Sequence, residues 1–106
     1  MDFGVLIRKM TQAACEGDGA GVAACFTEDG VYHDVFYGSF EGRGRIAEMI
    51  NDYFHRDACN FYWDMHDPES DGETGYCRYV FSYESKLGGA KGTRTMFEGV
   101  AIAMLQ

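Results

Sequence analysis

Asp34 is the residue of this chain whose type and surroundings best suit acid–base chemistry. It stands two positions after Tyr32 in a short strand-like run, so the two side chains share one face of an extended backbone. Aromatic residues follow at Phe36, Tyr37 and Phe40. Such neighbours would partly desolvate the carboxylate, and desolvation favours the form that has accepted a proton. We therefore interpret Asp34 as a candidate general base in an aromatic pocket.

A purely structural role for Asp34 is also consistent with its position. An aspartate at the end of a strand often accepts hydrogen bonds from the backbone N–H groups of the turn that follows. In that role the carboxylate fixes the turn and takes no part in a reaction. Two interpretations likewise apply to Tyr79 and Tyr83, whose hydroxyls either donate to a ligand oxygen or are satisfied at the rim of an aromatic core.

The four cysteines, Cys15, Cys25, Cys59 and Cys77, form neither a CxxC pair nor the closely spaced pattern of small secreted scaffolds. We interpret them as reduced thiols that mostly fill the core. None of the usual pairs of zinc ligands occurs in the sequence, so we expect neither a metal nor a cofactor.

With 106 residues, of which 46% are hydrophobic and 15% aromatic, the chain fits one domain spanning residues 1–106. Its 17 acidic and 9 basic residues give a net charge of -8, which repels phosphate backbones, so we expect no nucleic-acid partner. No stretch approaches the roughly 20 apolar residues of a membrane span. Arg8 and Lys9 follow the first apolar run instead of preceding it as in a secretion signal. We expect a soluble, cytoplasmic protein without a membrane partner.

Three segments show the spacing of amphipathic helices. Residues 3–16 form the first and end at Gly17, and Asp18 is suited to cap a second, short helix that completes a hairpin. A third helix begins at Arg43. Because positive charge opposes the helix dipole there, we expect Arg43 to bind a carboxylate such as Glu41. The apolar positions of the third helix are Ile46, Met49, Ile50, Tyr53 and Phe54.

The remaining segments indicate β-strands. A strand over residues 31–34 precedes a glycine-punctuated segment, residues 35–42, that we expect to be irregular. Residues 61–66 alternate between apolar and polar, residues 68–75 supply a turn, and the last strand runs from about residue 93 to 105. Helices followed by an antiparallel meander predict an α+β fold with the helices against one face of a curved sheet. The strand after the turn places these residues on one face: Cys77, Tyr79, Phe81 and Tyr83.

The last strand has two unlike faces. One is too apolar to remain in water, and we expect it to be the interface of a homodimer. The other is reduced to small residues, which either leave room for a cavity or let a helix approach closely. The apolar face consists of Met96, Val100, Ile102 and Met104, and the small face of Gly99, Ala101 and Ala103.

The run FTEDGVYHDVFYG, which begins at Phe26, and the FEGR that ends at Arg43 resemble the nuclear transport factor 2-like superfamily. More narrowly they resemble its SnoaL-like polyketide cyclases and ketosteroid isomerases. The resemblance implies a cone-shaped, curved antiparallel sheet wrapped around the N-terminal helix hairpin and the third helix. It leaves the chemistry open, because isomerases, cyclases, hydrolases, dehydratases and non-catalytic binders share this scaffold. Relatives have one more strand after the position of Leu105, so we expect either a longer native chain or a partner over that strand edge.

Within this resemblance, Asp34 matches the general-base aspartate of the ketosteroid isomerases, with Val35 in place of the proline that usually follows. The tyrosine and the acid that stabilise the substrate oxyanion in those enzymes correspond to Met10 and about Ala101, and neither can donate a hydrogen bond. Steroid isomerisation by the family mechanism is thereby disfavoured. The resemblance also places the face of Tyr32 and Asp34 inside the cone.

These observations predict a homodimeric small-molecule-binding protein with an aromatic pocket. Its ligand would be apolar or carbonyl-bearing, and Asp34 would serve as the general base of an isomerase, cyclase or lyase. The alternative is a non-catalytic ligand-binding or dimerisation module of the same fold, in which Asp34 only fixes a turn. The candidate ligand-binding residues are Tyr32, Phe36, Tyr37, Phe54, Trp63, Tyr79, Phe81 and Phe97.

Overall fold

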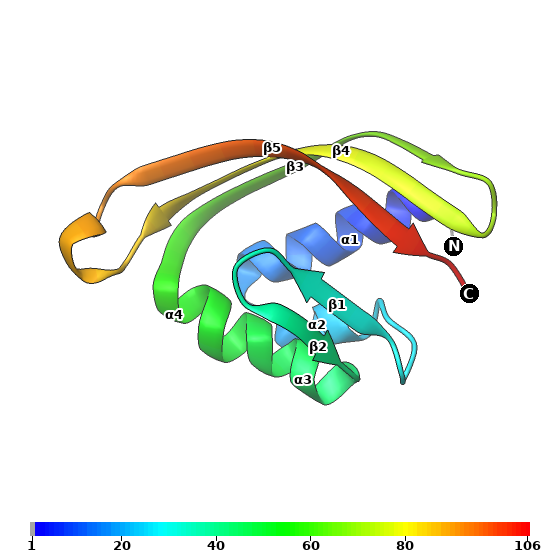
Figure 1. Cartoon of the computed structure of the whole chain (residues 1–106), viewed down its shortest axis with the longest axis horizontal. Coiled ribbons are helices and arrows are strands. Elements are labelled where there is room, and N and C mark those ends of the chain that lie inside the picture. The colour runs from blue at the N-terminus through cyan, green and yellow to red at the C-terminus, as the bar shows by residue number, and fades with distance from the viewer. Residues whose placement is uncertain (1) are drawn as a thin grey trace.

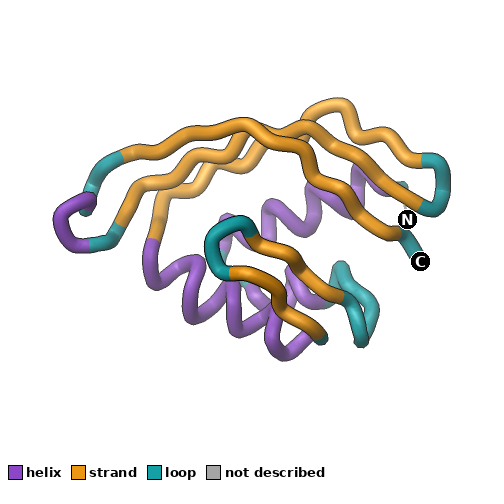
Figure 2. Tube along the Cα trace, viewed as in Figure 1, coloured by secondary structure: helices purple, strands orange, loops and turns teal. Residues whose placement is uncertain are grey.

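A curved antiparallel sheet arches over the helices in the computed structural model, which describes residues 2–106 (Figure 1). The sheet contains three strands in the order β3-β4-β5, and a separate hairpin of two strands, β1-β2, lies below it (Figure 2). This architecture is α+β, as predicted. The strands are β1 (Val31–Asp34), β2 (Gly38–Glu41), β3 (Ala58–Ser70), β4 (Thr74–Ser85) and β5 (Arg94–Met104).

The helix hairpin forms as the sequence predicts. In α1 (Phe3–Glu16) the Asp2 side chain accepts a hydrogen bond from the N–H of Val5, and Gly17 ends the helix in the left-handed conformation with φ 77°. The carboxylate of Asp18 then caps α2 (Gly19–Ala23) by accepting from the N–H of Gly21 at 2.9 Å. The buried face of α1 packs against β3, so the helix hairpin lies beneath the sheet.

The third helical segment is continuous but not uniform. It comprises α3 (Arg43–Glu48), a π-helical turn, η1 (Met49–Phe54), and α4 (His55–Asp57). The sequence spacing predicts ordinary helix throughout, and the wider π turn departs from that prediction. Tyr53 and Phe54, which lie in this turn, are partly buried and pack against the core. Ile46, Met49 and Ile50 are buried as expected.

Within residues 2–106, Arg43 forms no ion pair with a carboxylate. Its Nε and one terminal nitrogen donate to the carbonyl oxygen of Phe26 at 2.9 and 2.7 Å. This carbonyl lies just beyond the end of α2, where backbone acceptors lack helical partners, so a guanidinium can bind there without a negatively charged side chain. The prediction of Glu41 as its partner is wrong.

Residues 35–42 are more regular than predicted, because part of this segment forms β2. It pairs with β1 in an antiparallel register that aligns Tyr32 with Phe40 and Asp34 with Gly38. Only residues 35–37 form the connecting turn, and Gly38 follows it with φ 89°. Glycine adopts that conformation without strain, so the aromatic run folds back as a hairpin. Phe40 is thereby buried in the core.

The turn predicted at residues 68–75 is shorter than expected. β3 continues through Pro68 to Ser70, and the connection to β4 is confined to residues 71–73. Pro68 is tolerated because the pairing of β3 with β4 shifts register between His66 and Glu69. A proline needs no ladder partner at such a bulge.

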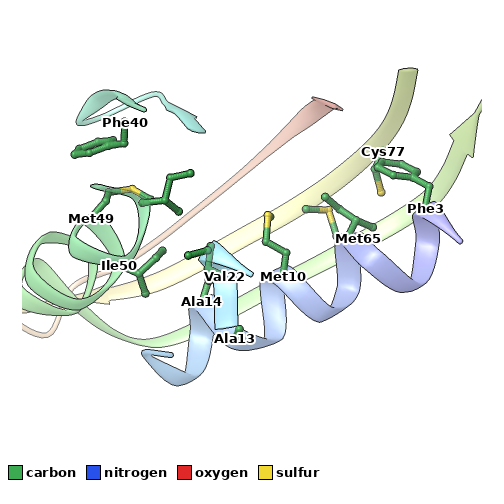
Figure 3. Close-up of a cluster of buried hydrophobic side chains, with 13 residues drawn as sticks. Phe3, Met10, Ala13, Ala14, Val22, Phe40, Met49, Ile50, Met65 and Cys77 are labelled. Atoms are coloured by element: carbon green, nitrogen blue, oxygen red, sulfur yellow. The ribbon is translucent and has the colours of Figure 1, made fainter. Parts of the chain in front are cut away.

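The buried core lies between α1, the helical segment after Arg43 and the concave face of the sheet (Figure 3). Methionine, isoleucine and alanine side chains supply most of it. On β4 the predicted inward face is confirmed, with Cys77 and Phe81 almost fully buried. None of the helices formed by residues 2–106 is long and apolar enough to cross a membrane.

At Gly99, the small face of β5 shows neither of the two arrangements predicted for it. Tyr79 lies directly opposite Gly99 in the β4-β5 register. A Cβ atom added to Gly99 would stand 2.5 Å from the Tyr79 hydroxyl. The space left by this glycine therefore holds a tyrosine from the adjacent strand, while Ala101 and Ala103 pack against the core. The opposite face of β5 is exposed as predicted, with Val100 and Ile102 accessible to 60% and 65%.

Candidate functional site

Two adjoining cavities are lined by residues of the β1-β2 hairpin, the third helical segment and the sheet. The first, which we call the inner cavity, has a volume of about 80 Å³ and contains the carboxylate predicted to act as a base. Eight of the nine predicted site residues line it, and Tyr37 is the exception. The lining residues are Tyr32, His33, Asp34, Val35, Phe36, Phe54, Trp63, Tyr79, Phe81 and Phe97.

The Asp34 carboxylate combines the two arrangements that the sequence left open. Its Oδ2 accepts hydrogen bonds from the N–H groups of Phe36 and Tyr37 at 2.9 and 3.0 Å, so it fixes the turn. The same half-buried side chain lines the inner cavity. Within residues 2–106, no hydrogen bond or ion pair engages Oδ1. One oxygen is therefore committed to structure, and the other is available to a ligand.

Tyr32 and Tyr79 contribute hydroxyl groups near this carboxylate. Burial, followed by the negative charge of Asp34 and the proximity of Tyr79, raises the pKa of Tyr32 well above its ordinary value. The Tyr32 hydroxyl therefore keeps its proton at neutral pH and is able to donate it in a hydrogen bond. Tyr79 stands edge-on to Trp63, with ring centroids 6.1 Å apart, so its ring forms a wall of the cavity.

Trp63 supplies a donor that the sequence did not reveal. Its indole Nε1 is buried, and it has no hydrogen-bond partner within residues 2–106. An unpaired buried N–H costs about 1–3 kcal/mol. Trp63 is also one of the residues that line the inner cavity. Sequence reasoning treated Trp63 as an apolar wall, and only its packing shows that the N–H lacks a protein acceptor.

The second cavity, which we call the outer cavity, is larger, with a volume of about 210 Å³. It shares Phe36, Phe54 and Phe81 with the inner cavity, so these side chains form the partition. Phe54 and Phe61 stack with centroids 4.3 Å apart and planes 7° from parallel. The residues found only in the outer cavity are Tyr37, Asp57, Ala58, Phe61, Tyr83, Ser85 and Leu87. Of these, only Tyr37 was predicted as a ligand-binding residue.

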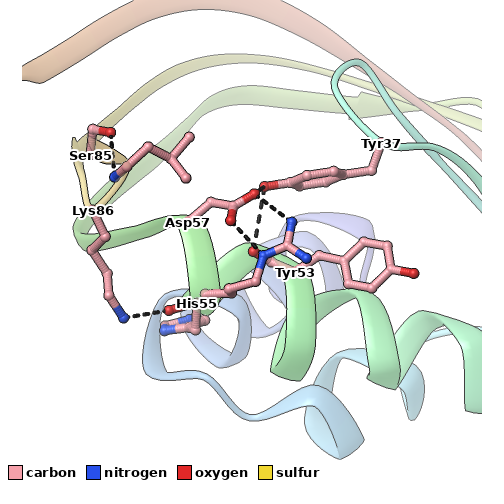
Figure 4. A network of polar contacts seen from close by, with 8 residues as sticks. Tyr37, Tyr53, His55, Asp57, Ser85 and Lys86 are labelled. Atoms are coloured by element: carbon pink, nitrogen blue, oxygen red, sulfur yellow. Dashed lines mark hydrogen bonds and ion pairs between the residues drawn. The ribbon is translucent and has the colours of Figure 1, made fainter. Parts of the chain in front are cut away.

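A hydrogen-bond network joins the β1-β2 turn to the end of α4 (Figure 4). The Tyr37 hydroxyl donates to Oδ2 of Asp57 at 2.7 Å, and the Arg56 guanidinium binds both oxygens of Asp57 at 2.6 and 2.9 Å. The bond from Arg56 is the main cause that lowers the pKa of Asp57, and the Tyr37 bond adds to it. Nearby, Lys86 Nζ donates to the carbonyl oxygen of His55 at 2.8 Å.

Within residues 2–106, no hydrogen bond joins a histidine side chain to a cysteine side chain. His33 is exposed, and its Nδ1 lies 2.7 Å from the Ser39 hydroxyl. All four cysteines are free thiols, and burial is the main cause that raises the pKa of Cys15 to about 11, which keeps it protonated. No group of three histidine, cysteine or acidic side chains within residues 2–106 is placed to hold a metal ion.

Comparison with known proteins identifies the fold. A family model described as the SnoaL-like domain matches residues 7–106. No functionally curated protein matches the sequence. A hypothetical protein with a ketosteroid isomerase-like fold from Catenulispora acidiphila, solved in complex with trimethylamine, superimposes with a TM-score of 0.83 at 15% identity. That likeness covers 95% of this chain and 75% of the other.

Two further solved structures resemble the chain. An LEH-like epoxide hydrolase from M. tuberculosis has a TM-score of 0.73 at 18% identity, covering 95% of this chain and 71% of its own. The epoxide hydrolase/cyclase-like enzyme SalBIII, solved for its role in pyran ring formation in polyether salinomycin, has a TM-score of 0.77 at 19% identity. That likeness covers 97% of this chain and 79% of the other. At these identities the likeness is one of fold.

Proposed function

The chain belongs to the SnoaL-like family of the nuclear transport factor 2-like superfamily, and from this premise we propose that it transforms a small carbonyl-bearing molecule in the inner cavity. Asp34 acts as the general base. The observation that carries the proposal is that Asp34 and Trp63 line the same cavity, while Oδ1 of Asp34 and the buried Nε1 of Trp63 have no hydrogen-bond partner within residues 2–106. Proton abstraction beside a carbonyl requires a base and a hydrogen-bond donor at one site.

The proposed step is transfer of a proton from the carbon next to the carbonyl to Oδ1 of Asp34. The C–H electron pair moves into the new carbon–carbon double bond, and negative charge develops on the carbonyl oxygen. The N–H of Trp63 stabilises that charge, with the hydroxyls of Tyr32 and Tyr79 as further donors. These groups take the place of the donors expected at Met10 and Ala101, of which Met10 is buried in the core. Isomerase, cyclase and lyase outcomes all begin with this step.

Deuterium exchange into cyclohexanone tests this step without knowledge of the natural substrate. In D₂O, the protein should speed incorporation of deuterium beside the carbonyl, and the rate should saturate with ketone concentration. Proton NMR measures the loss of the exchanging signal. A rate no greater than that of an equal concentration of free aspartate would contradict the role of Asp34 as a base, because a positioned base exceeds one in solution.

A second candidate function is binding without turnover. It is favoured by the bonds from two backbone N–H groups to Asp34, and by the aromatic side chains that surround this carboxylate. A carboxylate among aromatic rings suits a small alkylammonium ion, which is attracted both by the charge and by the ring faces. The Catenulispora protein of this fold was solved with trimethylamine, which supports an amine as the ligand class in this second candidate.

Choline and 3,3-dimethylbutan-1-ol separate the two candidate ligand classes, because they share one shape and differ in charge. If the cavity is an amine site, choline should bind at least about tenfold more tightly, since desolvated cation–π contacts contribute about 2 kcal/mol. Trp63 is the only tryptophan in the chain and lines the inner cavity, so its fluorescence reports binding. Equal affinities for the two compounds would exclude the amine site.

The exposed face of β5 supports a homodimer. Met96, Val100, Ile102 and Met104 are accessible to between 60% and 79%, a stripe of apolar surface along one strand. Sedimentation equilibrium at micromolar concentration should therefore give twice the mass of 11.9 kDa. Ile102→Lys should reduce that mass to the monomer value, because a lysine ammonium would be buried in the interface. Leu87→Lys, at an exposed position outside this face, is the matched control and should remain dimeric.

A further inference from the structure

Tyr37 connects two carboxylates that lie far apart in the sequence. Its backbone N–H donates to Oδ2 of Asp34 at 3.0 Å, and its hydroxyl donates to Oδ2 of Asp57 at 2.7 Å. The Tyr53 carbonyl oxygen is 3.4 Å from the same hydroxyl, a longer contact than the one to Asp57. Asp57 itself ends α4 and is held by Arg56 (Figure 4). The carboxylate of Asp34 is thus linked through one residue to the third helical segment.

The turn that carries Asp34 has few other attachments to the helices. Val35 and Phe36, at its tip, are accessible to 79% and 60%. The Phe36 ring touches Phe97 with centroids 5.9 Å apart, which attaches it to the sheet and not to α4. Within residues 2–106, Tyr37 is the residue of this turn that hydrogen-bonds to the helical segment, through its hydroxyl, and its ring also makes an edge-on contact with Tyr53 at 5.6 Å.

We propose that Tyr37 and Asp57 are positioning residues for Asp34. By tying the turn to α4, the hydrogen bond from Tyr37 to Asp57 keeps the N–H groups of residues 36 and 37 aimed at Oδ2 of Asp34. Oδ1 is thereby held toward the inner cavity. This inference rests on the proposed function, because it assigns Tyr37 and Asp57 a part in placing the proposed base. Neither residue touches the reacting atoms.

The charges around Asp57 agree with this role. The guanidinium of Arg56 neutralises the carboxylate, so Asp57 remains an ionised acceptor without attracting a ligand cation into the outer cavity. Burial and the bond to Asp57 raise the pKa of Tyr37, so the hydroxyl remains a donor at neutral pH. The contact between Tyr37 and Asp57 therefore keeps its donor and its acceptor throughout the pH range in which Asp34 would act.

Four variants test the inference in the cyclohexanone exchange reaction. Tyr37→Phe removes the hydroxyl and keeps the ring, and Asp57→Ala removes the acceptor. Both should lower kcat by about tenfold or more with KM changed less than about threefold, because the cavity wall is kept while the base is misplaced. Asp57→Asn still offers an oxygen to Tyr37 and should recover most of kcat. Tyr62→Phe removes another tyrosine–aspartate bond, to Asp64 on the sheet, and should leave kcat unchanged.

Amide hydrogen exchange separates the failure of this inference from the failure of the proposed function. The amides of Phe36 and Tyr37 should exchange faster in Tyr37→Phe than in the wild type, and no faster in Tyr62→Phe. Equal protection in the wild type and Tyr37→Phe, or an Asp57→Asn variant as impaired as Asp57→Ala, would overturn the positioning role. A wild-type protein that is inactive but shows the amide difference would overturn the proposed function alone.

Discussion

Asp34→Asn is expected to lower the rate of cyclohexanone exchange by roughly 10²–10⁴-fold, the usual contribution of a general base. The asparagine amide has nearly the same shape as the carboxylate but cannot accept the proton. Its Oδ1 is still able to accept the two hydrogen bonds that the N–H groups of Phe36 and Tyr37 now donate to Asp34. The turn is therefore kept while the chemistry is lost, and proton NMR of the ketone measures the loss.

Asp34→Ala separates the structural role of the carboxylate from its chemical one. Alanine removes both backbone hydrogen bonds, so its free energy of unfolding should fall by about 1–2 kcal/mol, while that of Asp34→Asn changes by less than about 1 kcal/mol. Asp64→Asn is the matched control, since Asp64 is a half-exposed aspartate paired with His66 outside both cavities. Exchange by Asp34→Asn at the rate of Asp64→Asn would show that Asp34 serves only the turn.

Gly19→Ala is expected to lower the free energy of unfolding by about 1–3 kcal/mol through overpacking. A Cβ atom at this position would stand 2.5 Å from the carbonyl oxygen of Ala47 and 2.6 Å from Oδ1 of Asn51. The N–H of Gly19 also donates to Asn51 at 3.1 Å, so α2 approaches the third helical segment closely at this point. A backbone carbonyl cannot move aside as the end of a side chain can, so the helices must separate.

Gly44→Ala is the matched control for that variant, because Gly44 also lies in a helix but a Cβ atom there meets nothing within 4 Å. Alanine has the higher helix propensity, so the free energy of unfolding should rise by about 0.5–1 kcal/mol. Urea denaturation followed by circular dichroism measures both variants. A Gly19→Ala protein as stable as Gly44→Ala would mean that α2 and α3 do not pack as closely as described.

Hydrophobic spacing and capping residues were sufficient to predict most of the fold. The repeat of apolar residues over 3–16, ended by Gly17 and followed by Asp18, specifies the helix hairpin with little help from the rest of the chain. The alternation around Cys77 and Phe81 likewise identifies the inward face of β4. These signals are local, because helix periodicity, capping and strand alternation each involve residues only a few positions apart in the sequence.

Other features depended on partners that are distant in the sequence. β2 exists because residues 38–41 pair with β1, and a short run containing glycine and serine shows little strand propensity by itself. Gly99 marks a place that a tyrosine from β4 fills, although sequence reasoning allowed only a cavity or a helix there. Arg43 binds a backbone carbonyl, and the sequence does not show which carbonyl lies within its reach.

The candidate site likewise combines features that the sequence shows with features that only the tertiary structure shows. By itself, the sequence determined that the chain carries an aspartate in an aromatic hairpin of the SnoaL-like type, because residue types and short spacings are properties of the chain. Only the tertiary structure decided that Asp34 commits one oxygen to the turn, that Trp63 has an unpaired N–H, and that Asp57 binds Tyr37. Hydrogen bonds depend on directions and on distances of about 3 Å between elements. Those distances are set when the hairpin, α4 and the sheet pack together.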